Sequence, residues 1–216
     1  ETDDDGNNIL YYAVKSENID LVQYLISKDK IPVTNKNKRG ETILQRACDD
    51  GNYEIVRYLV ELDEFNLYDK DEDGKSILYY AIASGKFEIV KYLVELDNID
   101  LTSTTGNGET LLHACFDDYC PKLEMIQYLV SLNKIDLNAK AKGWRNNKST
   151  ILHMACSGSN LDIVKYLTTL KDLDLKAKNG SGENALHVAC ENGDLEIVKH
   201  LVSLKICDLK DTNDNQ

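Results

Sequence analysis

A turn position recurs along the 216-residue chain at a nearly constant interval. Successive copies are 34 residues apart in four of the five steps and 40 apart in the remaining one. In chain order they are Gly6, Gly40, Gly74, Gly108, Lys148 and Gly182. A unit of this length cannot bury an apolar face alone, so tandem copies predict a stacked array in which each unit packs on its neighbours.

Each unit carries the same local signals. An Asn, Thr or Ser stands before a short apolar segment, where its side-chain oxygen is suited to cap the first turn of a helix. These residues are Asn8, Thr42, Ser76, Thr110, Thr150 and Asn184. A second segment follows with apolar residues at helical spacing, as in Tyr53-Glu-Ile-Val-Arg-Tyr-Leu-Val. In three units a glycine between the segments, at 51, 85 and 193, predicts a turn. The pattern predicts two antiparallel helices per unit.

The clearest copy is Asn179 to Leu204. The pattern shared by the copies, Gly-x-Thr-x-Leu-His-x-Ala-Cys-x-x-Gly-x-x-Glu-Ile-Val-x-x-Leu, which this copy follows except for Asn184 in place of Thr, resembles the ankyrin repeat. The resemblance covers residues 3–210 in six copies. It implies an all-α solenoid of antiparallel helix pairs with short β-hairpin fingers, and a role in binding other proteins rather than catalysis. We expect residues 1–216 to form a single array of repeats at about 3–36, 37–70, 71–104, 105–140, 141–178 and 179–212. Both ends look cut, which predicts a fragment of a longer protein, although a processed or tagged terminus is an alternative.

Apolar runs and cysteine positions indicate the cellular compartment of the protein. No apolar run approaches the roughly 20 residues that span a bilayer, and no secretory signal is visible. Cys48, Cys156 and Cys190 share one slot, with Cys115 one residue before it in a fourth repeat. Packed helices lie about 8–10 Å apart, beyond the roughly 7 Å Cα limit for a disulfide. We therefore expect core thiols in an intracellular, cytoplasmic protein.

Two rows of side chains recur at fixed positions. His113, His153 and His187 invite a metal or catalytic interpretation, but they lie one per repeat without a convergent carboxylate or nucleophile, so structural hydrogen bonds are expected. Tyr11, Gln45 and Tyr79 replace this histidine in the first three repeats, and we expect the N-terminal half to fray first. The second row comprises Tyr24, Tyr58, Tyr92, Tyr128 and Tyr166, with His200 in the last copy. It predicts an aromatic ladder between second helices, with binding of a flat ligand as an alternative.

The family's binding surface maps onto residues beside the turn position and at the end of each first helix. In this chain those positions hold twelve acidic and four basic residues, from a total net charge of −12. Such a field steers a basic partner and repels nucleic acid, although acidic solenoids also gain solubility in this way. Our candidate contacts on this concave surface are Arg39, Glu41, Asp49, Asp50, Glu72, Asp73, Lys75, Asn107, Glu109, Asp117 and Asp118.

The fourth repeat is irregular at both ends. Two residues are inserted near Asp118 and four in the following finger, residues 140–148, which has four basic residues, no acidic one and the only tryptophan. Insertions in repeat proteins often lie on the binding face, and Trp and Arg are enriched in hot spots. Trp144 and Arg145 are therefore candidate contacts, although a lone tryptophan often covers core between repeats.

These observations predict a protein-binding module without cofactor or metal. The alternative is a structural spacer, or a unit that self-associates through its terminal helix faces. No phosphate loop, paired carboxylates in a pocket or Cys/His dyad supports an enzyme. The partner is expected to be a protein or peptide, with no nucleic acid and no membrane insertion, and the chain is expected to be a monomer unless its ends associate.

Overall fold

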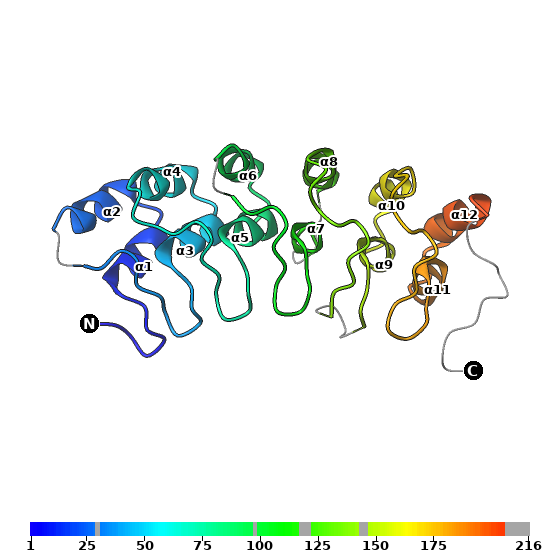
Figure 1. The fold of residues 1–216 in the computed structure, drawn as a ribbon, viewed down its shortest axis with the longest axis horizontal. Helices are drawn as coiled ribbons and strands as arrows, with labels where there is room; N and C mark the ends of the chain where they lie inside the picture. Colours follow the sequence, from blue (N-terminus) through cyan, green and yellow to red (C-terminus); the bar gives the residue numbers. More distant parts are fainter. Residues whose placement is uncertain (29–30, 97–98, 117–121, 143–146, 206–216) are drawn as a thin grey trace. The chain divides into compact units, whose positions relative to one another are not determined.

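The computed structural model describes residues 1–28, 31–96, 99–116, 122–142 and 147–205. The chain divides into two compact units, Glu1–Gly106 and Asn107–Gln216, each built from helix pairs (Figure 1). Unit 1 contains α1 (Ile9–Lys15), α2 (Ile19–Ile26), α3 (Ile43–Asp50), α4 (Tyr53–Glu61), α5 (Ile77–Ala83) and α6 (Phe87–Val94). Unit 2 contains α7 (Leu111–Ala114), α8 (Leu123–Ser131), α9 (Ile151–Ser157), α10 (Leu161–Leu167), α11 (Ala185–Glu191) and α12 (Leu195–Ser203). The described residues form no regular strand, so the predicted all-α fold is confirmed.

Within each unit the helices form two layers. The first helices of the pairs lie side by side, the second helices form a parallel row, and the hairpin loops extend on the side of the first helices (Figure 1). Leucines from the second position of each first helix lie in the core, with Leu10, Leu44 and Leu78 at most 1% exposed in unit 1. Their equivalents in unit 2, Leu112 and Leu152, are at most 2% exposed. The periodic leucines therefore hold the layers together, as predicted.

The predicted caps start the first helices. The side chain of Asn8 accepts from the backbone N–H groups of Leu10 and Tyr11, at 2.9 and 3.2 Å. Thr42 accepts from the N–H of Gln45 at 3.2 Å, and the Gln45 side chain accepts from the N–H of Thr42 in return. Each cap satisfies donors that the first turn of a helix leaves unpaired. The turns between helices close as predicted, because Gly51, Gly85 and Gly193 all have positive φ.

The hairpin fingers have less strand pairing than regular β-hairpins. Three of them contain a single antiparallel bridge, Lys36 with Thr42, Lys70 with Ser76 and Ala141 with Ser149. Adjacent fingers of unit 1 are joined by backbone hydrogen bonds, from Lys38 N to Asp5 O at 2.9 Å and from Glu72 N to Arg39 O at 2.9 Å. We call this set of bonds the fingertip ladder. In unit 2 it continues from Lys142 N to Asn107 O at 2.9 Å.

The fingertip ladder explains why glycine occupies the turn position. Gly40 has φ +75°, and a Cβ atom there would lie 3.0 Å from the backbone nitrogen of Glu72. A side chain would therefore push the next finger away as well as strain the turn. Lys148 occupies the same left-handed conformation with φ +47°, which confirms that it is the turn position of the long finger.

The cysteines are free thiols in the part of the chain that the structure describes. Cys48, Cys115 and Cys156 are buried as predicted, and burial raises the pKa of the Cys48 thiol strongly. Cys190 is exposed, so its prediction as a core residue was wrong. Cys190 lies in α11, the first helix of the last repeat. Among the described residues, α11 packs against α9 and α12, but no first helix of a following repeat covers its other side. Cys120 and Cys207 lie outside the described residues.

Two members of the row of tyrosines and histidine contact the preceding second helix or the residue after it. The ring of Tyr92 in α6 meets that of Tyr53, the first residue of α4, edge-on at a centroid distance of 5.7 Å. His200 of α12 similarly contacts the hydroxyl of Thr168 after α10, at 2.9 Å. The sixth residue of each of these second helices thus reaches the preceding second helix or its C-terminal end. Tyr24 has no preceding helix to contact among the described residues and is 58% exposed.

Candidate protein-interaction surface

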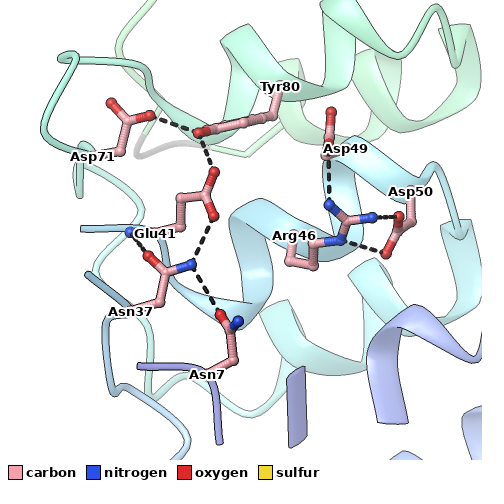
Figure 2. A network of polar contacts seen from close by, with 8 residues as sticks. All are labelled: Asn7, Asn37, Glu41, Arg46, Asp49, Asp50, Asp71 and Tyr80. Atoms are coloured by element: carbon pink, nitrogen blue, oxygen red, sulfur yellow. Dashed lines mark hydrogen bonds and ion pairs between the residues drawn. The ribbon is translucent and has the colours of Figure 1, made fainter. Parts of the chain in front are cut away.

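A continuous polar network joins the fingers and first helices of unit 1. The side chain of Asn37 is at its centre (Figure 2). Its Oδ1 accepts from the N–H groups of Arg39 and Glu41, at 2.9 and 3.0 Å. Its Nδ2 donates to Asn7 Oδ1 at 3.1 Å and to Glu41 Oε2 at 2.8 Å. One amide therefore fixes its own turn, the preceding finger and the Glu41 carboxylate.

Tyr80 extends this network to the third finger. Its hydroxyl lies 2.6 Å from Asp71 Oδ2 and 2.9 Å from Glu41 Oε1 (Figure 2). Burial, together with these two hydrogen bonds, raises the pKa of Tyr80 strongly. A phenol carries one proton, so the two carboxylates share a single donor. The Asp71 carboxylate also accepts from the N–H of Lys75 at 2.7 Å. Glu41 is thereby held in place by side chains from two different repeats.

A second cluster holds Asp49 and Asp50 at the end of α3. Arg46 Nε donates to Asp50 Oδ2 at 2.9 Å, its Nη2 contacts the other Asp50 oxygen, and its Nη1 lies 3.3 Å from Asp49 Oδ2 (Figure 2). The guanidinium also lies 5.5 Å from the centre of the Tyr11 ring. Burial raises the pKa of the Asp49 carboxyl, and Arg46 opposes that shift.

Both aspartates were predicted as contacts, yet they share the single positive charge of Arg46. The Asp50 side chain is only 12% exposed, whereas that of Asp49 is 42% exposed. Sequence reasoning missed Arg46, although its spacing of three and four residues from the two aspartates places all three on one helix face. It missed Tyr80 for a different reason, because Glu41 lies in the preceding repeat.

The remaining candidates of unit 1 lie at the fingertips. Arg39, Glu72 and Asp73 are exposed, and their side chains project from backbone that the fingertip ladder fixes. Lys75 is half-buried, with its ammonium 5.0 Å from the centre of the Tyr79 ring. Unit 1 therefore combines a fixed polar network with exposed charged tips.

Charge is divided unequally between the two units. Residues 1–106 carry 22 acidic and 12 basic side chains, a net charge of −10. Residues 107–216 carry 15 and 13, a net charge of −2. Ten of the twelve net negative charges thus belong to the unit that contains the polar network.

Unit 2 has a different surface at the matching positions. Arg46 and Tyr80 occupy the fourth place of their helices, where unit 2 has Ala114, Met154 and Val188, all at most 7% exposed. Among the predicted contacts, Asn107 is exposed and Glu109 is half-buried. Asp117, Asp118, Trp144 and Arg145 lie outside the described residues.

The histidines of unit 2 make structural hydrogen bonds, as predicted. His153 Nδ1 accepts from the N–H of Thr150 at 3.3 Å, so its Nε2 carries the proton and donates to Glu183 O at 3.0 Å. His113 is placed in the same way, between the N–H of Thr110 and Ser149 O. Burial lowers the pKa of both imidazoles. Each neutral histidine joins the start of its helix to the next finger.

Gln45 makes the same connection in unit 1. Its Oε1 accepts from the N–H of Thr42 at 2.7 Å, and its Nε2 donates to Lys75 O at 3.1 Å. A glutamine amide offers one acceptor and two donors, so it reproduces the pattern of a neutral imidazole. The replacement of histidine in the second repeat is therefore no loss of a hydrogen bond, contrary to the reason given for early fraying.

The described residues form no metal-binding cluster and no membrane-spanning helix. None of their histidine, cysteine, aspartate and glutamate side chains gather in groups of three or more that could hold a metal ion. No helix among them has the length and apolar character to cross a membrane.

Comparison with known proteins agrees with the repeat pattern. A family model described as ankyrin repeats, three copies, matches residues 1–69, 62–141 and 111–213. The ankyrin repeat domain of Bcl-3 has a similar structure, with a TM-score of 0.74 and 24% sequence identity over 98% of this chain and 91% of that one. A second similar chain comes from the complex of the predatory endopeptidase Bd0816 from Bdellovibrio bacteriovorus with immunity protein Bd3460, with a TM-score of 0.72 and 22% identity over 94% and 99% of the two chains. At these identities the likeness concerns the fold. No protein of curated function matches the sequence.

Proposed function

The chain belongs to the ankyrin-repeat family, and from that premise we propose that it binds a basic protein or peptide on the acidic surface of unit 1. Ankyrin repeats are protein-interaction modules, generally without enzymatic activity. The observation that carries the proposal is the network around Asn37, Glu41 and Tyr80, which fixes carboxylates in a unit of net charge −10. Fixed carboxylates lose little conformational freedom when a cationic side chain binds, so less of the interaction energy is spent on ordering.

Within this proposal the exposure of each side chain ranks the candidate contacts. Glu72, Asp73 and Arg39 are exposed at the fingertips and are the primary contacts in this proposal. The carboxylates of Glu41 and Asp71, which the network holds in place, provide negative charge beneath them. Asp49 contributes less to binding of the partner, and Asp50 least, because Arg46 holds both carboxylates and offsets one of their two negative charges. In unit 2, considered by itself, the candidate contacts are Asn107, Glu109, Asp117, Asp118, Trp144 and Arg145.

A reducing, cytoplasmic location fits this function. Cys48, Cys115 and Cys156 are buried free thiols in separate repeats, so none of them is placed to form a structural disulfide. Such cysteines persist where thiols stay reduced. The negative field also argues against nucleic acid or an anionic membrane surface as the partner.

Affinity capture from lysate of the source cells, followed by binding measurements on the purified partner, tests the proposal. Replacing Glu72→Lys and Asp73→Lys together should abolish capture of a basic partner, which salt should also release from the parent. The matched control is Glu64→Lys with Glu95→Lys, because both residues are exposed in unit 1 away from the fingertips and the charge change is equal. Equal loss in the two variants would mean that net charge, rather than this surface, attracts the partner.

A parallel variant, Trp144→Ala with Arg145→Ala, tests the long finger. Loss of binding only in that variant would move the interface to unit 2. If the folded parent retains no protein at either salt concentration, the proposal fails.

A further inference from the structure

The first three fingertips of unit 1 carry charges of alternating sign. Each tip has two charged residues directly before its turn glycine, and all six side chains are exposed. They are Asp4 and Asp5 on the first tip, Lys38 and Arg39 on the second, and Glu72 and Asp73 on the third. The order of charge along the tips is therefore negative, positive, negative, although the unit as a whole is strongly acidic.

The backbone holds the tips in this order. The fingertip ladder joins the second tip to the first and to the third. Beyond the third tip, the carbonyl of Asp73 accepts from the N–H of Gly106, the last residue of unit 1, at 2.7 Å. Lys38 and Arg39 thus have a finger on each side and are exposed all the same. Their exposure belongs to the tips themselves and does not depend on where the array begins.

The tip charges are not matched within unit 1. At the bases of the second and third fingers, opposite charges do pair, because Lys36 Nζ lies 3.3 Å from Asp69 Oδ1. No ion pair between described residues involves any of the six tip side chains. Exposed opposite charges that are not in contact attract one another only weakly through water. The alternating charges are therefore available to a partner.

The spacing of the tips fits an extended chain. The first helices α1, α3 and α5 pack side by side, and packed helices lie about 8–10 Å apart. An extended chain rises about 3.3 Å per residue, so about three of its residues span one repeat. A segment that crosses the tips therefore meets a reversal of charge about every three residues.

We propose that unit 1 selects an extended segment whose charge order is basic, acidic, basic, with about three residues between the centres of successive groups. The inference rests on the proposed function and narrows it. The basic groups pair with the outer tips, and the acidic group pairs with Lys38 and Arg39. Such a segment still has a net positive charge, whereas a uniformly basic one places like charges against the second tip.

Synthetic peptides provide the probes. Lys-Lys-Ser-Glu-Glu-Ser-Lys-Lys has the complementary order, and it has the same order in both chain directions. Lys-Lys-Lys-Lys-Ser-Glu-Glu-Ser is its control, because it has the same composition and net charge in another order. Nuclear magnetic resonance titration at physiological salt gives each affinity and identifies the amides that respond. The parent should bind the alternating peptide about fivefold more tightly than its control, with responses at the tips.

Reversal of the second tip separates the two charge orders. Lys38→Glu with Arg39→Glu makes the protein more acidic, yet it should weaken binding of the alternating peptide about fivefold and strengthen that of Lys-Lys-Ser-Lys-Lys-Ser-Lys-Lys. Lys28→Glu with Arg57→Glu is the matched control, because both residues are exposed in unit 1 away from the fingertips and the charge change is equal. That control should weaken neither peptide. Circular dichroism first establishes that the variants are folded.

Three results would each overturn the proposal. They are equal affinity of the parent for the two peptides of equal composition, no binding of the alternating peptide, and unchanged or tighter binding of that peptide by the Lys38→Glu/Arg39→Glu variant. The proposed function is tested apart from these results, by capture through Glu72 and Asp73. A captured basic partner that binds the Lys38→Glu/Arg39→Glu variant more tightly than the parent would support the proposed function and refute this charge order.

Discussion

The two units place different chemistry at the same helix positions. In unit 1 the fourth residue of each first helix is Tyr12, Arg46 or Tyr80, and each makes a hydrogen bond or ion pair with a carboxylate. In unit 2 the same positions hold the buried residues Ala114, Met154 and Val188. Conversely, all four histidines of the chain lie in unit 2.

The difference separates two tasks that one scaffold can perform. Unit 1 uses its inner positions to hold exposed negative charge in a fixed arrangement. Unit 2 uses them to enlarge the core, and it ties helices to fingers through the neutral imidazoles of His113 and His153. The stability of each unit should therefore depend on different interactions.

Loss of a histidine tie should have the largest effect. His153→Ala removes the acceptor for the N–H of Thr150 and the donor to Glu183 O, and leaves a cavity in the buried interior of unit 2. We expect the free energy of unfolding to fall by about 2–4 kcal/mol. Chemical denaturation monitored by circular dichroism measures this change.

His153→Gln is the informative control for that experiment. Because Gln45 already makes the equivalent bonds in unit 1, glutamine should restore all but about 1 kcal/mol of the loss. A glutamine variant as unstable as the alanine variant would show that the imidazole contributes by shape rather than by its two hydrogen bonds.

Acidification should weaken unit 2 before unit 1. Burial places the folded-state pKa of His113 and His153 below the ordinary value of 6.5, so the unfolded chain binds protons first as the pH falls. The stability from these groups is complete above pH 6.5 and declines from there toward the folded-state pKa. Protonation of Nδ1 would also direct a second donor at the N–H of the capping threonine.

Hydrogen exchange at pH 7.5 and 5.5 follows the two units separately. The amides of α9 and α11 should lose protection at the lower pH, while those of α3 and α5 should not. In unit 1 the hydrogen bond from Tyr12, assisted by Asn7, lowers the pKa of Asp3 to about 2, so stability from Asp3 is lost only below about pH 4. Replacing both His113 and His153 by glutamine should remove the difference between the two pH values in unit 2.

Removal of one hydroxyl in unit 1 should have the smallest effect. Tyr80→Phe deletes the donor shared by Glu41 and Asp71, and we expect a loss of about 1 kcal/mol because water can solvate the freed carboxylates. Faster amide exchange at residues 37–41 and 71–75 should accompany it. Tyr68→Phe serves as the control, since Tyr68 is 56% exposed and its hydroxyl makes no hydrogen bond found among the described residues. Equal effects of the two substitutions would remove Tyr80 from the network.

The fold could be predicted because its signals are local and repeated. Capping residues such as Thr42, turn glycines such as Gly51 and core leucines such as Leu44 act within a few residues of their positions, and copies of one pattern reinforce one another. The exposure of Cys190 could not be read from the same pattern, because it depends on the neighbour that packs beside α11 rather than on the local sequence.

The sequence predicted acidic residues at the fingers and at the ends of the first helices, but not the contacts between these residues. The sequence identified Glu41, Asp49 and Asp50 as members of an acidic face. It did not show that Arg46 binds both aspartates, although all three residues lie on one helix, or that Tyr80 joins Glu41 to Asp71 across a distance of 30 residues in the chain. The bond between Tyr80 and Glu41 forms only when successive repeats are stacked, so a motif within one repeat does not contain it.

The fingertip ladder has a consequence for how such a surface can change over evolutionary time. The bonds from Lys38 N to Asp5 O and from Glu72 N to Arg39 O use only backbone atoms, so they impose no requirement on the side chains at these tips. Substitutions there alter the chemistry presented to a partner without moving the frame that presents it. A lineage can therefore exchange one partner for another through tip residues alone, while a turn glycine such as Gly40, which lies against the next finger, is a position that must be retained.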